Sequence, residues 1–207
     1  MVLKHEEIAK MLTRVAAEFH AQSGYLSEID SRFGDGDHGV TIEKIAKLID
    51  QKVAAWADDD IKEFLDDLGM GVMGVNGGSA GPLYGTLLSG LAVNLPDGAQ
   101  AVDAAGLKAM LAGCLSEMEE ITTARVGDKT MMDALIPAVA AAQDAPDDVV
   151  AIVKAAADAA QAGAKASEGF VSRFGRARSY KEQTIGTPDA GAVSTALLFA
   201  GLYQAMI

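Results

Sequence analysis

Cysteine is almost absent from this chain of 207 residues, and aromatic residues are few. The single cysteine, Cys114, excludes a disulfide framework and a metal cluster held by several thiolates. Phe, Trp and Tyr make up only 5% of the residues, and alanine dominates the 50% that is hydrophobic. Because alanine is the strongest helix former and adds little to the face of a β-sheet, the composition favours an all-α fold.

Positive charge is also scarce, since 17 Lys and Arg are outnumbered by 29 Asp and Glu and the net charge is −12. This acidity argues against nucleic acid or an anionic membrane as a partner, because both attract basic surfaces. The hydrophobic half of the chain suffices for a buried core, which excludes disorder. We therefore expect a single domain over residues 1–207.

Targeting and membrane-spanning patterns are missing as well. The first residues carry charges where a signal peptide needs an apolar run. Two uncharged stretches, 68–96 and 190–207, contain glycines or hydroxyl side chains and lack the basic flanks that anchor a span. The expected location is the cytoplasm.

Apolar residues recur at helical spacing in eight segments, which predicts an antiparallel bundle or closed barrel of about eight helices. The first stripe covers residues 8–19, and Ser23–Gly24 is expected to end that helix. The acidic run Asp58–Asp60 ends the second, Asp60 with Glu63 resembles a capping box for the third, and Asp189 is expected to cap the last. The remaining segments, 30–40, 74–82, 122–130 and 167–191, hold most of the unusual residues. A rigid helical scaffold commonly presents a site on such loops.

The first of these loops contains three carboxylates, Asp30, Asp35 and Asp37, within eight residues. They repel one another unless water or a cation intervenes, and oxygen ligands without a His or Cys set suit Mg²⁺. Asx turns and a helix cap are the alternative reading. The segment also matches G-x-G-x-x-G, but no apolar strand precedes it and two variable positions are Asp, so a dinucleotide fold is rejected. The spacing does not fit an EF-hand either.

Histidine occurs three times. His38 follows the carboxylates and is a candidate donor to a phosphate oxygen, the alternative being a loop histidine bonded to a nearby Asp. His5 and His20 fall on the polar side of the first helix, where we expect them to be solvated.

Three further segments are candidates for phosphate or nucleotide contact. The glycine-rich run at 76–86 precedes a helix start, where free N–H groups and the helix dipole attract phosphate, although close helix packing explains it equally well. Thr130 and Met131 open a helix and are placed to cap it or to cover a flat ring. The long loop 167–191 gathers positive charge that fits phosphate binding, in Arg173, Arg176, Arg178 and Lys181.

Taken together, the four segments resemble the nucleotide-binding L subunit of bacterial dihydroxyacetone kinase. The resemblance covers almost the whole chain, with the motifs in the same order. It rests on Asp30-x4-Asp-Gly-Asp-His-Gly, Gly-Gly-Ser-Ala-Gly-Pro-Leu-Tyr-Gly-Thr, Gly-Asp-Lys-Thr-Met-Met-Asp and Gly-Arg-Ala…Gly-Thr-Pro-Asp-Ala-Gly-Ala. Two departures are Ala190, where the family usually has Pro, and the segment 121–123, where relatives often carry Arg-Gly near the adenine.

The resemblance implies a closed barrel of eight antiparallel helices with ADP or ATP at one end. It makes Asp30, Asp35 and Asp37 ligands of two Mg²⁺ ions, and it places those three with His38 and Arg176 at the catalytic centre. The remaining matches are nucleotide-binding positions, some at phosphate and some near the nucleotide: His38, Gly39, Thr41, Gly78, Ser79, Ala80, Thr130, Met131, Arg176, Asp189, Ala190 and Gly191.

The family also implies partners, because the chain shows no evident nucleophile or base for a substrate. In the family a separate K subunit holds dihydroxyacetone, and a phosphocarrier protein of the phosphotransferase system recharges the bound ADP. The alternatives are an ATP-exchanging kinase component for a tetrulose or a fatty acid, and a regulatory module whose ADP-loaded form binds a transcription regulator.

Overall fold

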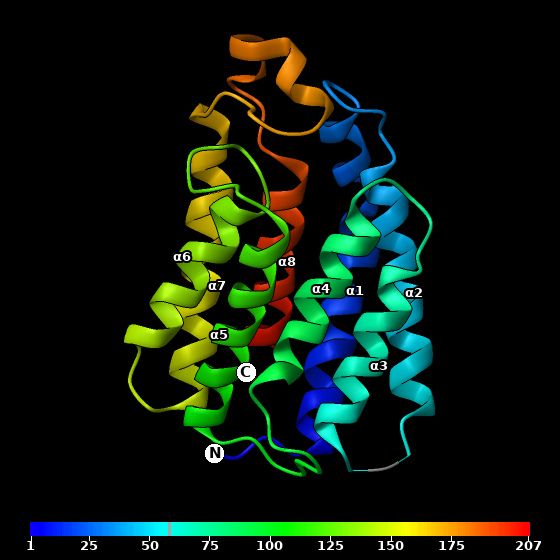
Figure 1. The fold of residues 1–207 in the computed structure, drawn as a ribbon, viewed down its shortest axis with the longest axis vertical. Helices are drawn as coiled ribbons and strands as arrows, with labels where there is room; N and C mark the ends of the chain where they lie inside the picture. Colours follow the sequence, from blue (N-terminus) through cyan, green and yellow to red (C-terminus); the bar gives the residue numbers. More distant parts are fainter. Residues whose placement is uncertain (58) are drawn as a thin grey trace.

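The computed structural model describes residues 1–57 and 59–207, so Asp58 of the acidic run lies outside the described residues. The described residues form eight α-helices, with two short 3₁₀ segments, η1 and η2, before the last (Figure 1). Their bounds are α1 His5–Asp30, α2 His38–Ala55, α3 Ile61–Met73, α4 Ala80–Val93, α5 Ala104–Ile121, α6 Met132–Asp144, α7 Val149–Ala166, η1 Ser167–Gly169, η2 Arg176–Thr184 and α8 Ala190–Gln204. The all-α prediction is confirmed.

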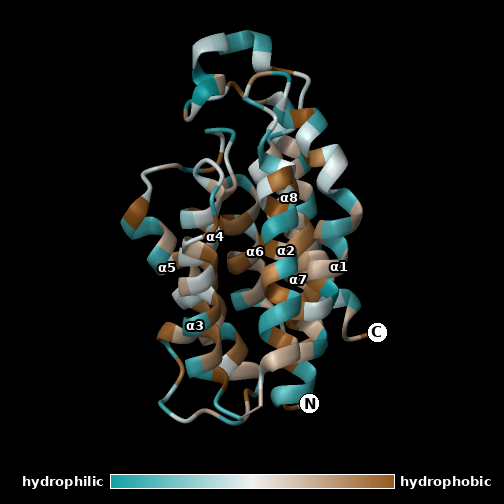
Figure 2. Cartoon of the chain, turned by 90° about the vertical axis from the view of Figure 1, so that its right-hand side faces the viewer, coloured by the Kyte–Doolittle hydropathy of each residue, from teal (hydrophilic) through white to brown (hydrophobic). Residues whose placement is uncertain are grey.

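The helices run along the long axis of the molecule and pack in a ring. α8 packs against α1 and α7, and the ring continues through α1 to α2 and through α7 to α6. On the other side α3 packs on α4 and α4 on α5, while smaller contacts of α5 with α6 and of α2 with α3 close the circle. Apolar residues cover the inner faces and hydrophilic ones gather on the loop at the end that carries η2 (Figure 2). Large buried side chains such as Phe19, Tyr84 and Phe199 fill the interior.

Helix ends follow the predicted caps. Asp60 accepts a hydrogen bond from the Glu63 N–H at 3.1 Å, and Asp189 accepts one from the Ala192 N–H at 2.8 Å. Each cap satisfies an N–H group that has no partner inside its helix.

The predicted end of the first helix at Ser23–Gly24 is wrong, because α1 continues to Asp30. Glycine destabilises the interior of a helix by only about 1 kcal/mol relative to alanine, and tertiary packing overrides that cost. Here the small residues are used for packing: a Cβ added to Gly39 would lie 1.9 Å from the Ser23 carbonyl oxygen. The same Cβ would lie 2.7 Å from the Ser27 backbone nitrogen, so the start of α2 rests on the backbone of α1 on both sides of residue 24.

Alternating helix directions bring the four unusual loops to the same end of the barrel (Figure 1). These loops join α1 to α2, α3 to α4, α5 to α6 and α7 to α8. Among the described residues, no helix is both long enough and apolar enough to cross a membrane.

Candidate nucleotide and metal site

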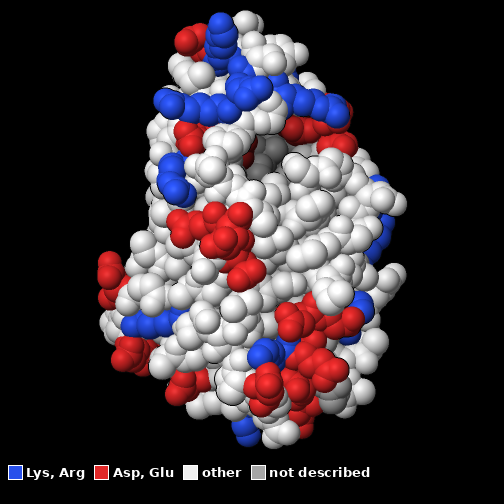
Figure 3. Space-filling model, in the orientation of Figure 1, with Lys and Arg blue, Asp and Glu red and all other residues white. Residues whose placement is uncertain are grey.

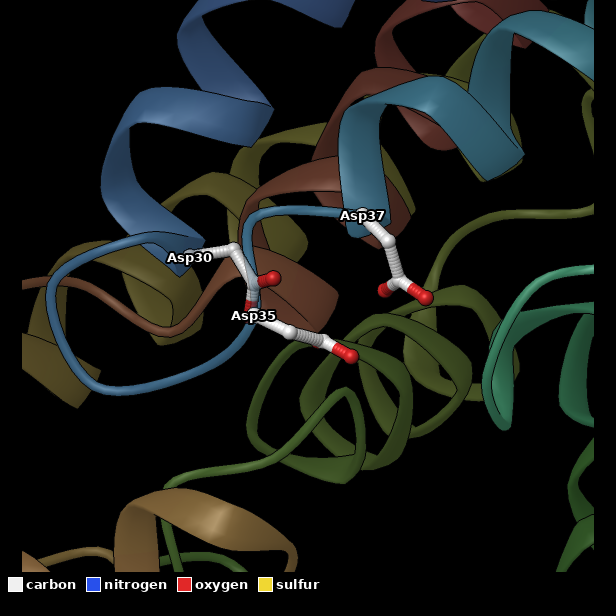
Figure 4. A group of neighbouring side chains, drawn as sticks. All are labelled: Asp30, Asp35 and Asp37. Carbon is white, nitrogen blue, oxygen red and sulfur yellow. The ribbon is translucent and has the colours of Figure 1, made fainter.

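Three carboxylates converge at the loop end of the barrel (Figure 4). Asp30 is the last residue of α1, Asp35 lies in the connecting loop and Asp37 directly precedes α2. One oxygen from each lies within 4.8 Å of the others. The turn that joins them depends on glycine, since Gly36 has φ +73° and a Cβ on Gly34 would lie 2.4 Å from Asp30 Oδ1.

The electrostatics of this cluster favour a bound cation. Burial, together with the charges of Asp35 and Asp30, raises the pKa of Asp37. Asp30 Oδ2 is buried and has no hydrogen-bond partner in the described structure. A buried carboxylate oxygen without a partner is costly, and a hard cation is the ligand that would satisfy it. The residues present therefore fit a magnesium site.

Beside the carboxylates lies a half-open cavity of about 300 Å³. Three helices, α2, α4 and α8, begin at its wall with His38, Ala80 and Ala190. The first N–H groups of a helix lack partners inside it and carry the positive end of its dipole, so three such ends favour an anion.

Most of the expected site residues line this cavity. Gly39 and Thr41 are the two that do not. Both are buried, Gly39 against Ser23 and Thr41 against Gly77, whose added Cβ would lie 2.0 Å from Thr41 Oγ1. The residues that do line it are Asp30, Asp35, Asp37, His38, Gly78, Ser79, Ala80, Thr130, Met131, Arg176, Asp189, Ala190 and Gly191.

The His38 ring is held from inside the barrel rather than by an aspartate. Its Nε2 lies 2.8 Å from Ser194 Oγ, which also accepts a hydrogen bond from the Tyr84 hydroxyl at 2.7 Å. Burial lowers the pKa of His38 to about 4, so the ring is neutral at pH 7. The alternative of a loop histidine bonded to a nearby Asp is therefore wrong.

A basic loop covers the cavity. We call residues 167–189 the lid; it contains η1 and η2. Arg176 Nη1 forms an ion pair with Asp35, and Phe174 and Ala177 line the cavity from the lid side. Figure 3 shows Lys and Arg gathered above a hollow with acidic side chains directly below. Arg173 instead pairs with Asp128 at 3.4 Å, and Arg178 and Lys181 do not line the cavity.

Sequence reasoning missed several residues of this region. Lys129 is 4% exposed, lines the cavity and has a left-handed backbone with φ +61°. Tyr84 and Ser194 come from α4 and α8, 110 positions apart, and no local pattern links them. His20 is partly exposed on the polar face, as expected, but the sequence did not predict its two carboxylate partners, since its ring nitrogens lie 2.8 Å from Glu43 and 2.9 Å from Asp50.

Comparison with known families agrees with this geometry. The model of the DAK2 domain family matches residues 32–204. The chain belongs to the DAK2 domain family.

Relatives of this DAK2 domain include free subunits of its own length. It is 31% identical to the ADP-binding subunit DhaL of PEP-dependent dihydroxyacetone kinase 2 from Listeria innocua, covering 96% of this chain and 93% of that one. It is 30% identical to the corresponding DhaL subunit of Escherichia coli, over 94% of this chain and 93% of the relative. A D-erythrulose kinase of Mycolicibacterium smegmatis is 33% identical, but the match covers 83% of this chain and only 30% of that enzyme.

Solved structures give the same result for the fold. The dihydroxyacetone kinase of C. freundii superposes with a TM-score of 0.75 at 28% identity, over 95% of this chain and 34% of that one. The same enzyme in complex with AMP-PNP and Mg²⁺ gives 0.70 at 26% identity, over 95% and 33%. The resemblance to the dihydroxyacetone kinase L subunit is thus confirmed, and the DAK2 domain spans about a third of that longer enzyme.

Proposed function

We propose that the chain is, over residues 1–207, the nucleotide-binding subunit of a dihydroxyacetone kinase. In this proposal it holds ADP or ATP with two Mg²⁺ ions and passes the terminal phosphoryl group to a ketose on a partner K subunit. The observation that carries the proposal is the convergence of three aspartates, three helix starts and Arg176 around one cavity. Phosphoryl transfer requires mainly positioning and neutralisation of charge, which this set supplies.

Each residue then has a defined part. Asp30, Asp35 and Asp37 would hold the Mg²⁺ ions, which neutralise charge on the phosphate oxygens when bound. Gly78, Ser79 and Ala80 at the start of α4, with Ala190 and Gly191 at the start of α8, would donate backbone N–H groups to phosphate or lie close beside it. Thr130 and Met131 would contact the nucleotide from the start of α6.

Arg176, His38 and the residues that support them also have roles in this proposal. Arg176 would exchange its carboxylate partner for developing charge on the transferred group. His38 would act through its backbone N–H at the start of α2, because its ring is already bonded to Ser194 and to the backbone of Ala190. Behind that helix start, Gly39 and Thr41 support its position, and Asp189 fixes the first turn of α8.

The group that accepts the phosphoryl group would be held by a partner subunit. In the described structure the cavity is lined by no cysteine, and its only histidine is already bonded to Ser194. The relatives of the same length are named as ADP-binding subunits of PEP-dependent kinases. These names support a separate K subunit for the ketose and a phosphocarrier protein that recharges ADP in place.

A nucleotide-retention experiment tests the proposal. The purified protein, dialysed with Mg²⁺, should retain ADP in a one-to-one ratio, and Asp37→Asn should lose it. Asp66→Asn, an exposed acid on α3, is the matched control. Without metal, Asp37→Asn should raise the melting temperature, because the raised pKa of Asp37 means that its charge destabilises the fold at neutral pH. Retention of nucleotide by both Asp35→Asn and Asp37→Asn would refute the metal assignment.

An ATP-exchanging kinase component is the second candidate, because the D-erythrulose kinase is 33% identical over most of this chain. In that case bound nucleotide should exchange freely during dialysis. ATP should then serve as the phosphoryl donor in place of the phosphocarrier, with a partner that binds erythrulose as the acceptor.

A further inference from the structure

Lys129 is a buried charged residue that the proposed function leaves without a part. It lies in the loop between α5 and α6, and its side chain reaches beneath the lid. Its Nζ donates hydrogen bonds to the carbonyl oxygens of Ser167 and Thr187, each at 2.5 Å. Burying an ammonium group is expensive unless such partners are provided, and a left-handed backbone in a residue other than glycine adds strain.

The two acceptors lie at opposite ends of the lid. Ser167 directly follows α7, and Thr187 comes shortly before α8. The same place is closed by the Asp189 N–H bond to Ser167 Oγ at 2.9 Å and by the Gly186 N–H bond to the Glu168 carbonyl at 2.7 Å. We call this set of contacts the neck of the lid.

The far part of the lid is held differently. At its tip, residues 174–180, the contacts with the rest of the molecule come from side chains: Arg176 pairs with Asp35, and the Tyr180 ring centroid lies 5.2 Å from that of Phe33. Arg173, just before the tip, is held more firmly, because its backbone N–H also donates to the Asp128 carbonyl at 3.1 Å. Exposed ion pairs contribute little to stability and are easily separated. Lys129, Ser167 and Thr187, in contrast, are all buried. The lid is therefore fixed at its neck and weakly held at its tip.

We propose that Lys129 is a positioning residue that fixes the neck of the lid, so that Arg176 at the tip returns to the carboxylates whenever the lid closes. The role of Arg176 rests on the proposed nucleotide function, while the pinned neck does not. Lys129 touches neither phosphate nor metal in this account, and it acts on nucleotide retention only through the lid. Burial lowers the pKa of the Lys129 ammonium group, and the negative charges of Asp189, Asp133 and Glu168 oppose that shift.

The chain offers a matched control. Lys165 is exposed and pairs with Glu168 at 2.7 Å, so it contacts the same neck from the solvent side. Lys129→Met and Lys165→Met remove the same charge from positions that differ in burial. A third variant, Leu107→Ala, creates a cavity in the buried face of α5 and measures what loss of stability alone does.

Trypsin supplies the first measurement, because the lid carries its own cleavage sites at Arg173, Arg176, Arg178 and Lys181. Without nucleotide, Lys129→Met should be cleaved in the lid about tenfold faster or more than the other two variants, since bonds from a charged donor are lost. With Mg²⁺ and a fluorescent ADP analogue, its nucleotide dissociation should accelerate by a similar factor. Unchanged cleavage, or equal effects in Leu107→Ala, would overturn the proposal.

Hydrogen exchange on the unaltered protein provides a test should Lys129→Met fail to fold. The amides of Gly186 and Asp189 at the neck should exchange much more slowly than amides of residues 174–180 at the tip. Equal exchange at neck and tip would show that the lid has no fixed neck. If Lys129→Met is cleaved faster but neither it nor the unaltered protein binds nucleotide, the role of Lys129 at the neck stands and the proposed nucleotide site is refuted.

Discussion

The two ends of the barrel are built from the same number of helix ends, but one is stabilised by packing and backbone hydrogen bonds and the other carries unbalanced charge. At the end away from the site, Trp56 stacks on Phe64 with ring centroids 3.8 Å apart, and Leu3 and Val102 exchange two backbone hydrogen bonds of 2.7 Å. The Ile61 N–H also donates to the Ala99 carbonyl at 2.8 Å. These contacts bury apolar surface and satisfy the backbone, so this end stabilises the fold.

The site end carries most of the unusual backbone, and two residues other than glycine, Lys129 and Lys181, are strained there by a positive φ. Of the described residues with positive φ, only Gly98 lies at the opposite end. The others lie in the four site loops: Gly36, Gly77, Gly78, Gly127, Lys129, Gly175, Lys181 and Gly186. A buried lysine, an unpartnered Asp30 oxygen and mutually repelling aspartates lie at the same end. Unbalanced charge thus collects where a ligand would neutralise it, and the opposite end supplies the stability that tolerates it.

The largest expected effect concerns the stabilising end. Trp56→Ala should lower the free energy of unfolding by about 3 kcal/mol, because it removes a buried aromatic ring from the stack with Phe64. Chemical denaturation measures this loss. Nucleotide retention with Mg²⁺, measured at a temperature where the variant stays folded, should remain unchanged. A loss of retention there would contradict the separation of the two ends.

A smaller effect is expected from the bonds behind the site. Ser194→Ala should cost about 1–2 kcal/mol of stability, because the Tyr84 hydroxyl loses a buried acceptor and His38 Nε2 loses its partner. It should also weaken nucleotide binding, since His38 begins α2. Calorimetric titration with MgADP measures the second effect. As control, Ser89→Ala removes a buried hydroxyl that has no hydrogen-bond partner among the described residues, and it should leave binding unchanged. Equal MgADP affinity of Ser194→Ala and Ser89→Ala would show that Ser194 does not support the nucleotide site.

The smallest effect concerns the middle of the barrel. Hydrogen bonds to Asp50 and Glu43 raise the pKa of His20, so its contribution to stability is complete below about pH 6.5 and is lost as pH rises through the higher folded value. His20→Gln should therefore flatten the fall in melting temperature over that interval. Because these groups are partly exposed, the change should be small and weaker at high salt. An unchanged pH profile would show that the three side chains are not coupled.

Much of the architecture follows from local sequence. The helical stripes and the caps at Asp60 and Asp189 depend on residues within one turn of each other, so each was predictable without tertiary information. The three carboxylates also lie close in sequence, which identified their loop as a metal candidate. Four motifs in order then identified the family.

Tertiary structure decided what depends on contacts between distant segments. α1 passes Ser23–Gly24 because Gly39 packs on it, and His20 is bound because α2 brings Glu43 and Asp50 alongside. The bonds between Tyr84, Ser194 and His38, and those from Lys129 to both ends of the lid, join residues far apart in the chain. Sequence periodicity reports which face of a helix is buried. It carries no information on which partner meets that face, and the choice of partners brought the candidate site residues together at this end of the barrel.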